Sequence, residues 1–154
     1  MATETRSAVH DHIRLGRLYP VSPDRVFRAF SDPAAKAAWF AGGDGYQVLE
    51  RSMDFRIGGR EKVQGRWETG AVSTFDAVYH DILPGERLVY SYVMHLDDRK
   101  ISVSLATIQL SAEDSGTRVI LDEQGVYLDG YDDSGSRARG TGMLLDRLGA
   151  SLVR

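Results

Sequence analysis

The stretch that decides the fold is Arg87-Leu88-Val89-Tyr90-Ser91-Tyr92-Val93-Met94-His95-Leu96. Large apolar and aromatic side chains occupy every second position of this stretch. Such a period of two is typical of a β-strand with one covered face, because successive side chains point to opposite sides of the sheet. We therefore expect Tyr90, Tyr92 and Met94 to face a covered interior and His95 to lie on the polar face.

The same period extends on both sides of this strand, from about Val48 to Tyr127. Turn-forming residues interrupt it at Gly58-Gly59, Thr69-Gly70, Pro84-Gly85, Asp97-Asp98 and Asp114-Ser115-Gly116. Because these breaks are spaced as hairpin turns are, the region predicts six antiparallel strands. Within the strand that starts near Ile101, the alternation changes phase before Ile108, which predicts a β-bulge near Ala106.

Two short helices are predicted before these strands. An extended segment from His12 to Tyr19 leads into Ser22-Pro23-Asp24, which offers an N-cap acceptor, a proline at the first helical position and an acid in the first turn. Ser31-Asp32-Pro33 repeats this start signal. The second helix is expected to continue to Trp39-Phe40 and to stop at Gly42-Gly43.

A long helix is predicted at the end of the chain, from about Ser136 to Leu152. Leucines recur there at three- and four-residue spacings, which produces an apolar stripe on one helix face. Three glycines interrupt it, each costing about 1 kcal/mol relative to alanine, so we expect them to serve close packing or to leave space for a ligand. The order of elements indicates an α+β domain in which one curved antiparallel sheet of about seven strands wraps around this helix.

Length and composition set limits on the protein's class. The chain has 154 residues, 42% hydrophobic and 27% charged, which suits one globular domain over residues 12–154 after a flexible tail over residues 1–11. A net charge of -3 argues against nucleic acid and membrane as partners. The absence of cysteine and of an apolar leader after Met1 favours the cytoplasm.

No group of polar side chains forms a recognisable catalytic or metal site. His10 and His12 can lie on one side of a strand, but a third ligand is missing, and His95 is solitary. Asp54 and Arg56, two apart on one expected strand face, either form a surface ion pair or meet a charged ligand. We therefore expect no metal and no cofactor, and we assign no catalytic residue.

Several short motifs together resemble one protein family. They are Arg25-Val26-Phe27, Asp32-Pro33, Trp39-Phe40, Asp54-Phe55-Arg56-Ile57-Gly58-Gly59-Arg60-Glu61, Arg87-Leu88-Val89-Tyr90-Ser91-Tyr92, Ser102-Val103-Ser104-Leu105-Ala106-Thr107, Gly116-Thr117-Arg118, Glu123-Gln124-Gly125 and Leu128-Asp129-Gly130. In this order, from Tyr19 to Leu152, they resemble the bacterial single-domain members of the SRPBCC (START-like) superfamily, in the branch named after activators of the heat-shock-protein-90 ATPase. The resemblance implies a helix-grip fold with a cavity between the sheet and the last helix.

The residues expected to contact a ligand in that cavity are mostly aromatic. They are Trp39, Phe40, Arg56, Trp67, Phe75, Tyr90, Tyr92, Met94, Glu123, Met143 and Leu144. Core packing alone would select the same aromatic residues. Two tyrosines on one inward face favour a cavity, because each buried hydroxyl needs a hydrogen-bond partner.

Glu123 is the candidate polar anchor of this cavity. It shares strand phase with Val119 and Leu121, so we expect it to point beneath the last helix, where desolvation raises the pKa of its carboxyl unless cations or donors compensate. In the alternative interpretation it lies at the end of the strand, hydrated or bonded to Arg147.

Three functions remain open at this stage, because superfamily members include lipid carriers, cyclase-like enzymes and chaperone regulators. The first is the binding of a small hydrophobic or amphipathic molecule. The second is an enzyme of cyclase or hydratase type that uses the same space. The third is a protein-interaction or chaperone-regulatory module. We rank them in this order. Among partners, a homodimer is also open.

Overall fold

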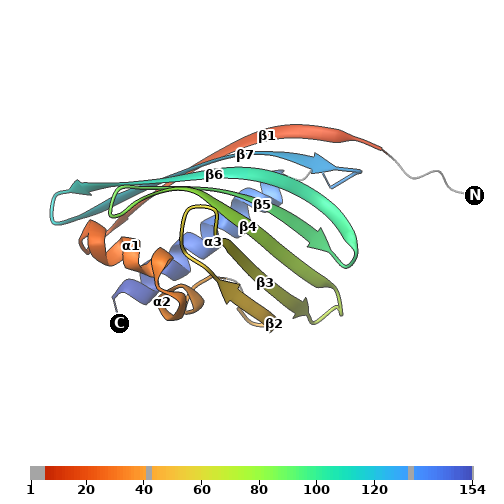
Figure 1. Ribbon diagram of the computed structural model, residues 1–154, viewed down its shortest axis with the longest axis horizontal. Helices are drawn as coiled ribbons and strands as arrows, with labels where there is room; N and C mark the ends of the chain where they lie inside the picture. The colour runs from red at the N-terminus through yellow and green to blue at the C-terminus, as the bar shows by residue number, and fades with distance from the viewer. Residues whose placement is uncertain (1–5, 41–42, 132–133, 154) are drawn as a thin grey trace, which may run out of the picture.

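A seven-stranded antiparallel sheet curves around one long helix in the computed structural model, which describes residues 6–40, 43–131 and 134–153 (Figure 1). The strands are β1 (Ala8–Tyr19), β2 (Tyr46–Met53), β3 (Arg60–Trp67), β4 (Val72–Leu83), β5 (Arg87–Leu96), β6 (Arg99–Glu113) and β7 (Gly116–Leu128). Their order across the sheet is β1-β7-β6-β5-β4-β3-β2, so the first strand pairs with the last. The predicted α+β helix-grip arrangement is confirmed.

Two short helices, α1 (Pro23–Ser31) and α2 (Pro33–Ala37), start at the predicted capping residues. The Ser22 side chain accepts a hydrogen bond from the backbone N–H of Arg25, and the Asp32 side chain accepts one from that of Ala35. α2 ends at Ala37, so Trp39 follows it. The expected stop at Gly42 lies outside the described residues.

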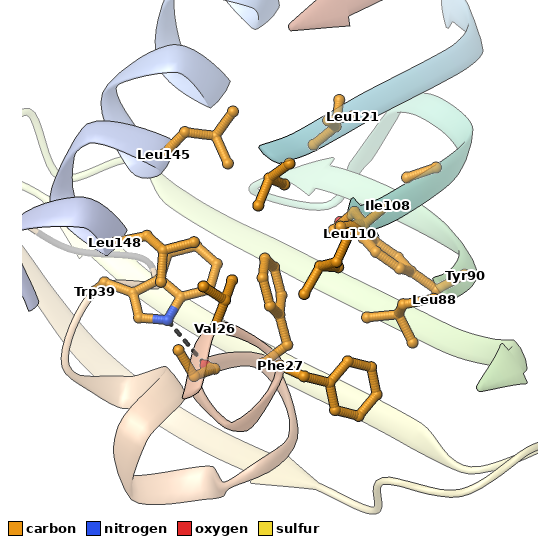
Figure 2. Close-up of a cluster of buried hydrophobic side chains, with 14 of the residues drawn as sticks. Val26, Phe27, Trp39, Leu88, Tyr90, Ile108, Leu110, Leu121, Leu145 and Leu148 are labelled. Atoms are coloured by element: carbon orange, nitrogen blue, oxygen red, sulfur yellow. Dashed lines mark hydrogen bonds between the residues drawn. The ribbon is translucent and has the colours of Figure 1, made fainter. Parts of the chain in front are cut away.

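The long helix α3 (Ser134–Leu152) lies across the concave face of the sheet, and α1 and α2 lie at the end where α3 finishes (Figure 1). It begins two residues before the predicted start at Ser136. Figure 2 shows Leu145 and Leu148 of α3 pointing into the same interior as Val26 of α1 and Leu121 of β7. The apolar stripe of α3 and the inner face of the sheet therefore cover each other, as predicted.

The inner face of the sheet carries the aromatic side chains of β5. Tyr90 and Tyr92 are both buried in the core cluster, which confirms the register predicted for this strand. The predicted bulge near Ala106 is wrong, because Ala106 pairs regularly with Tyr90. The irregularity instead lies at Ile101, between the partners of Met94 and His95.

The bulge was wrongly predicted because the inner face of β6 carries serines as well as apolar residues. Ser102 and Ser104 are buried, in phase with Ala106. Val103 and Leu105 point to the outer face and are exposed. Apolar side chains alone therefore suggest a change of phase that the backbone does not make. The serines are inside because a polar partner from α3 meets them there.

The first strand is longer than expected, since β1 begins at Ala8 rather than at His12. Residues 8–11 fall in the expected tail of residues 1–11, but here they pair with Leu128 to Gly125 of β7. Their side chains are exposed, so the pairing rests on backbone hydrogen bonds. Residues 1–5 of the expected tail lie outside the described residues. None of the helices in the described ranges is both long and apolar enough to span a bilayer.

Candidate ligand cavity

A cavity of about 650 Å³ lies between the inner face of the sheet and α3. Nine of the eleven predicted ligand-contacting residues line it, namely Phe40, Trp67, Phe75, Tyr90, Tyr92, Met94, Glu123, Met143 and Leu144. Its volume lies within the range of about 300–1,000 Å³ that is usual for small-molecule sites. Met143 and Trp67 are 66% and 42% exposed, so the cavity opens to solvent beside them.

One wall of the cavity is a continuous row of aromatic rings. The ring of Phe40 packs on that of Phe75 with centroids 5.0 Å apart, and Phe75 packs on Tyr92 at 4.9 Å. Tyr90 continues the row beyond Tyr92. Because the rings pack against one another, the wall presents apolar surface over most of its length.

Trp39 and Arg56 do not line the cavity. Trp39 is buried in the core, where its indole N–H donates to the carbonyl of Ala29 at 2.9 Å (Figure 2). Arg56 lies in the turn after β2 rather than on a strand. There it forms an exposed ion pair with Asp54, with 2.8 Å between Nε and Oδ2. This pair is the surface contact that was the alternative interpretation of these two residues.

Tyr92, Glu123 and Arg137 make the polar end of the cavity, and the buried Ser102 and Ser104 lie behind them in contact with Arg137. Tyr92 donates its hydroxyl to Oε1 of Glu123 at 2.8 Å. Arg137, from the first turns of α3, donates to the Tyr92 hydroxyl at 3.0 Å and to the Ser102 hydroxyl at 2.8 Å. These hydrogen bonds hold the first turn of α3 against β5 and β6.

Glu123 is inside this polar end, as its strand phase predicts, and it is 4% exposed. Burial raises the pKa of its carboxyl, while the hydrogen bond from Tyr92 and the charge of Arg137 act in the opposite direction. The nearby cation is Arg137, whereas the sequence pattern suggested Arg147. Arg147 also lines the cavity. Helical spacing alone does not tell which arginine of α3 reaches β7.

A second polar cluster, which the sequence analysis missed, lies behind the aromatic wall. The ammonium of Lys36 is 2.6 Å from Oε1 of Glu61, and the Tyr79 hydroxyl donates to the same oxygen at 2.5 Å. Burial lowers the pKa of Lys36, and the charge of Glu61 opposes that change. The Lys36 ammonium also lies 4.4 Å from the centre of the Phe40 ring. The strand phase that Glu61 shares with buried Val63 was the available signal.

Two glycines of α3 serve different purposes. A Cβ at Gly140 would meet no atom within 4 Å, and this residue lines the cavity. A Cβ at Gly149 would lie 3.0 Å from the ring of Tyr19. The two alternatives expected for these glycines, open space and close packing, therefore both occur in one helix.

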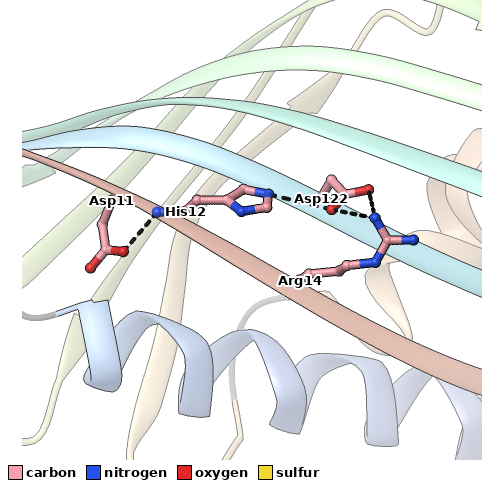
Figure 3. Close-up of polar contacts among 4 residues, drawn as sticks. All are labelled: Asp11, His12, Arg14 and Asp122. Atoms are coloured by element: carbon pink, nitrogen blue, oxygen red, sulfur yellow. Dashed lines mark hydrogen bonds and ion pairs between the residues drawn. The ribbon is translucent and has the colours of Figure 1, made fainter.

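The histidines near the start of the chain lie on the outer surface of the sheet. Figure 3 shows Asp122 of β7 between His12 and Arg14 of β1, where Arg14 donates to both of its carboxylate oxygens at 3.1 and 3.2 Å. His12 is 3.4 Å from the same carboxylate. Within residues 6–40, 43–131 and 134–153, no three or more His, Cys, Asp or Glu side chains come together as a metal site would require.

Comparison with known proteins identifies the family. The family model described as activator of Hsp90 ATPase homolog 1-like protein matches residues 20–152. The solved structure of an uncharacterised protein from Rhizobium leguminosarum is 42% identical, with a TM-score of 0.92 over 96% of this chain and 97% of that one. Protein Mll3558 from Rhizobium loti is 41% identical, with a TM-score of 0.87 over 94% and 99% of the two chains.

A more distant structure, protein CV1439 from Chromobacterium violaceum, is 30% identical, with a TM-score of 0.74 over 93% of this chain and 97% of that one. No curated protein matches the chain. The family model covers most of the sequence. Two solved structures match this chain over nearly their whole length at more than 40% identity. The chain therefore belongs to the activator of Hsp90 ATPase homolog 1-like family.

Proposed function

We propose that this protein binds a small, mostly apolar molecule in the cavity between the sheet and α3. The observation that carries the proposal is the cavity itself, whose volume is about 650 Å³. A concave space of this volume that is lined mainly by apolar and aromatic side chains, with a few polar groups, has the usual character of a small-molecule site. Family membership supports the proposal without naming the ligand.

The apolar and polar parts of the cavity wall indicate which chemical groups the ligand carries. The aromatic row of Phe40, Phe75, Tyr92 and Tyr90 offers apolar surface, so an apolar body gains free energy by leaving water there. The polar end offers a small number of fixed hydrogen-bonding groups, which orient a ligand rather than bind most of its surface. An amphipathic molecule satisfies both regions.

Nile red, an uncharged apolar dye, tests the proposal through its fluorescence on binding. The Gly140→Leu variant adds a side chain at a cavity-lining position where nothing lies within 4 Å. We expect it to weaken the affinity for Nile red by at least about tenfold, because the side chain takes up space that a ligand needs. The matched control is Ala150→Leu, which adds a leucine to the exposed face of the same helix, outside the cavity.

Unfolding of the variant does not explain a loss of binding in this design. Leucine is a better helix former than glycine by nearly 1 kcal/mol, so Gly140→Leu should melt at or above the temperature of the unmodified chain. If the unmodified chain fails to bind the dye, or if both variants bind it equally well, the cavity is not the binding site. Native mass spectrometry of the purified protein would identify a ligand that is retained from the cell.

A further inference from the structure

One charged side chain of the cavity lining has no counter-charge. The charged residues of the described lining are Glu123, Arg137 and Arg147. The first two compensate each other through Tyr92, which accepts a hydrogen bond from Arg137 and donates one to Glu123. Arg147 differs from both, because within residues 6–40, 43–131 and 134–153 no group forms a hydrogen bond or an ion pair with it. With Glu123 ionised, the described lining therefore carries one positive charge in excess.

Arg147 lies well away from the polar end of the cavity. Both arginines face the cavity from α3, and the rise of 1.5 Å per residue places Arg147 about 15 Å further along the helix axis than Arg137. Nη1 of Arg147 lies 3.5 Å from the place that a Cβ on Gly43 would take, beside the chain that connects α2 to β2. Phe40 of the aromatic wall lies just before this segment. A molecule that packs on the wall therefore has Arg147 within reach.

The guanidinium of Arg147 is accessible to such a molecule. In the described ranges every buried side-chain nitrogen or oxygen has a hydrogen-bond partner, so the nitrogens of Arg147, which have none, are not buried. The residue as a whole is only partly exposed. A guanidinium has five N–H donors in a planar fork, and none of them is used by a described residue here.

The surroundings of Arg147 add positive rather than negative charge. Arg51 donates to the carbonyl of Phe40 at 2.9 Å, and no described carboxylate pairs with Arg51 either. The acidic residue next to Gly43 in the sequence, Asp44, is exposed and forms no ion pair with either arginine. An anionic group beside Arg147 is thus attracted by two guanidinium groups that have no described counter-charge.

This charge balance indicates which ligand group suits the site. A cationic group would be repelled by Arg147, and an uncharged group would leave the guanidinium without a counter-charge. A group with two negative charges would exceed the single positive charge in excess on the lining. A carboxylate carries one negative charge, and its two oxygens match the guanidinium fork in two parallel hydrogen bonds.

We propose that the ligand is an amphipathic carboxylic acid whose carboxylate pairs with Arg147, while its apolar body lies against Phe40 and Phe75. This inference rests on the proposed function, because it specifies the charged group of the molecule that the cavity takes. The Tyr92 bridge at the polar end stays closed in this arrangement. The ligand then supplies the counter-charge that the described lining lacks.

Four biphenyl compounds that differ at one position test the inference on the unmodified protein. They are biphenyl-4-carboxylate, biphenyl-4-carboxamide, biphenyl-4-phosphonate and 4-phenylbenzylammonium, and their affinities are measured near neutral pH by displacement of Nile red. The carboxamide has the shape of the carboxylate but no charge. We expect the carboxylate to bind at least about tenfold more tightly than each of the others, because a charged acceptor strengthens a hydrogen bond by that order.

A variant then assigns the preference to Arg147. In Arg147→Gln the preference for the carboxylate over the carboxamide should fall to about threefold or less, while the carboxamide keeps its affinity because the aromatic wall is unchanged. The matched control is Arg139→Gln, which removes the same charge from the same helix at an exposed position outside the cavity lining. This control should keep the full preference, because a general effect of net charge would act on both variants alike.

The outcomes separate this inference from the function on which it rests. If the carboxamide binds the unmodified chain as tightly as the carboxylate, the cavity takes uncharged molecules and the carboxylate inference alone is wrong. A preference for the phosphonate or the ammonium compound overturns it equally, and so does a preference for the carboxylate that persists in Arg147→Gln. If neither Nile red nor any biphenyl binds, the proposed function fails as well. The comparison on the unmodified chain is decisive even if Arg147→Gln does not fold.

Discussion

The ammonium of Lys36 lies 2.6 Å from the carboxylate of Glu61 and forms a buried ion pair between α2 and β3. The side chains are 4% and 2% exposed, respectively. The hydroxyl of Tyr79 donates a further hydrogen bond to Glu61. Removing one member of such a pair leaves an uncompensated charge in the interior, which is far more costly than removing both.

We expect Lys36→Met to lower the free energy of unfolding by about 3–5 kcal/mol, because it leaves Glu61 buried without its cation. Adding Glu61→Gln to this variant should recover part of the loss, since no unpaired charge remains. Urea unfolding of the single and double variants measures both effects. Lys62→Met is the control, because it breaks a partly exposed pair with Glu50, for which a loss of about 1 kcal/mol or less is expected. Additive losses in the double variant would show that Lys36 and Glu61 do not act as a unit.

The carboxyl of Glu123 makes stability depend on pH. Burial raises its pKa above the ordinary value of 4.5. Between 4.5 and this raised pKa the folded chain holds more protons than the unfolded chain, so the contribution of Glu123 to the free energy of unfolding falls as pH rises. Glutamine cannot ionise. We therefore expect the unfolding free energy of Glu123→Gln, relative to that of the unmodified chain, to increase with pH in this window.

Urea unfolding of both chains from about pH 4 to about pH 8 measures the difference. Glu113→Gln is a control of opposite sign, because the hydrogen bond from Arg118 lowers the pKa of the exposed Glu113. The contribution of Glu113 to the free energy of unfolding is lost as pH falls below 4.5. Any change with pH in the difference between Glu113→Gln and the unmodified chain therefore lies on the acidic side. A difference for Glu123→Gln that does not change with pH would contradict the assignment.

The two glycines of α3 should respond in opposite ways to the same substitution. Gly140→Leu meets open space and gains nearly 1 kcal/mol of helix propensity. Gly149→Leu places a side chain against the ring of Tyr19, whose hydroxyl also donates to the carbonyl of Leu145. We expect a net loss of about 1–3 kcal/mol there, because overpacking outweighs propensity. Thermal unfolding distinguishes them, and equal shifts for both variants would refute the packing of α3 on β1.

Leu148 tests how α3 covers the sheet. Its side chain is fully buried against the core, so Leu148→Ala should lower the free energy of unfolding by about 2–5 kcal/mol. Met143→Ala on the same helix removes an exposed side chain at the mouth of the cavity and should change stability by about 0.5 kcal/mol or less. Similar losses in the two variants would mean that α3 is rotated about its axis.

Local periodicity is enough to predict much of this fold. The alternation in β5 determines that Tyr90 and Tyr92 face inward, and the same logic predicts that Glu123 does so in β7. The starts of α1 and α2 follow from Ser22 and Asp32, because a capping side chain bonds within its own turn. Each of these predictions depends on residues a few positions apart.

Features that depend on contacts between distant segments do not follow from local patterns in the sequence. Ser102 is buried because Arg137 of α3 bonds to it, and nothing near Ser102 in the sequence indicates that arginine. Lys36 and Glu61 likewise compensate each other from a helix and a strand. A charged or hydroxyl side chain in a short sequence pattern is expected at the surface. It can be buried only when a partner pairs with it, and that partner can lie far away in the sequence.

The pairing of β1 with β7 has a consequence for how the protein is made. Its partners are separated by about one hundred residues or more, so during synthesis β1 leaves the ribosome well before β7 and cannot pair until β7 has been made. An apolar strand in that position would invite association between nascent chains. β1 carries four exposed polar side chains, those of His10, Asp11, His12 and Arg14. These polar side chains favour solvation of the strand before it pairs. Once β7 has been made, Asp122 forms ion pairs with His12 and Arg14.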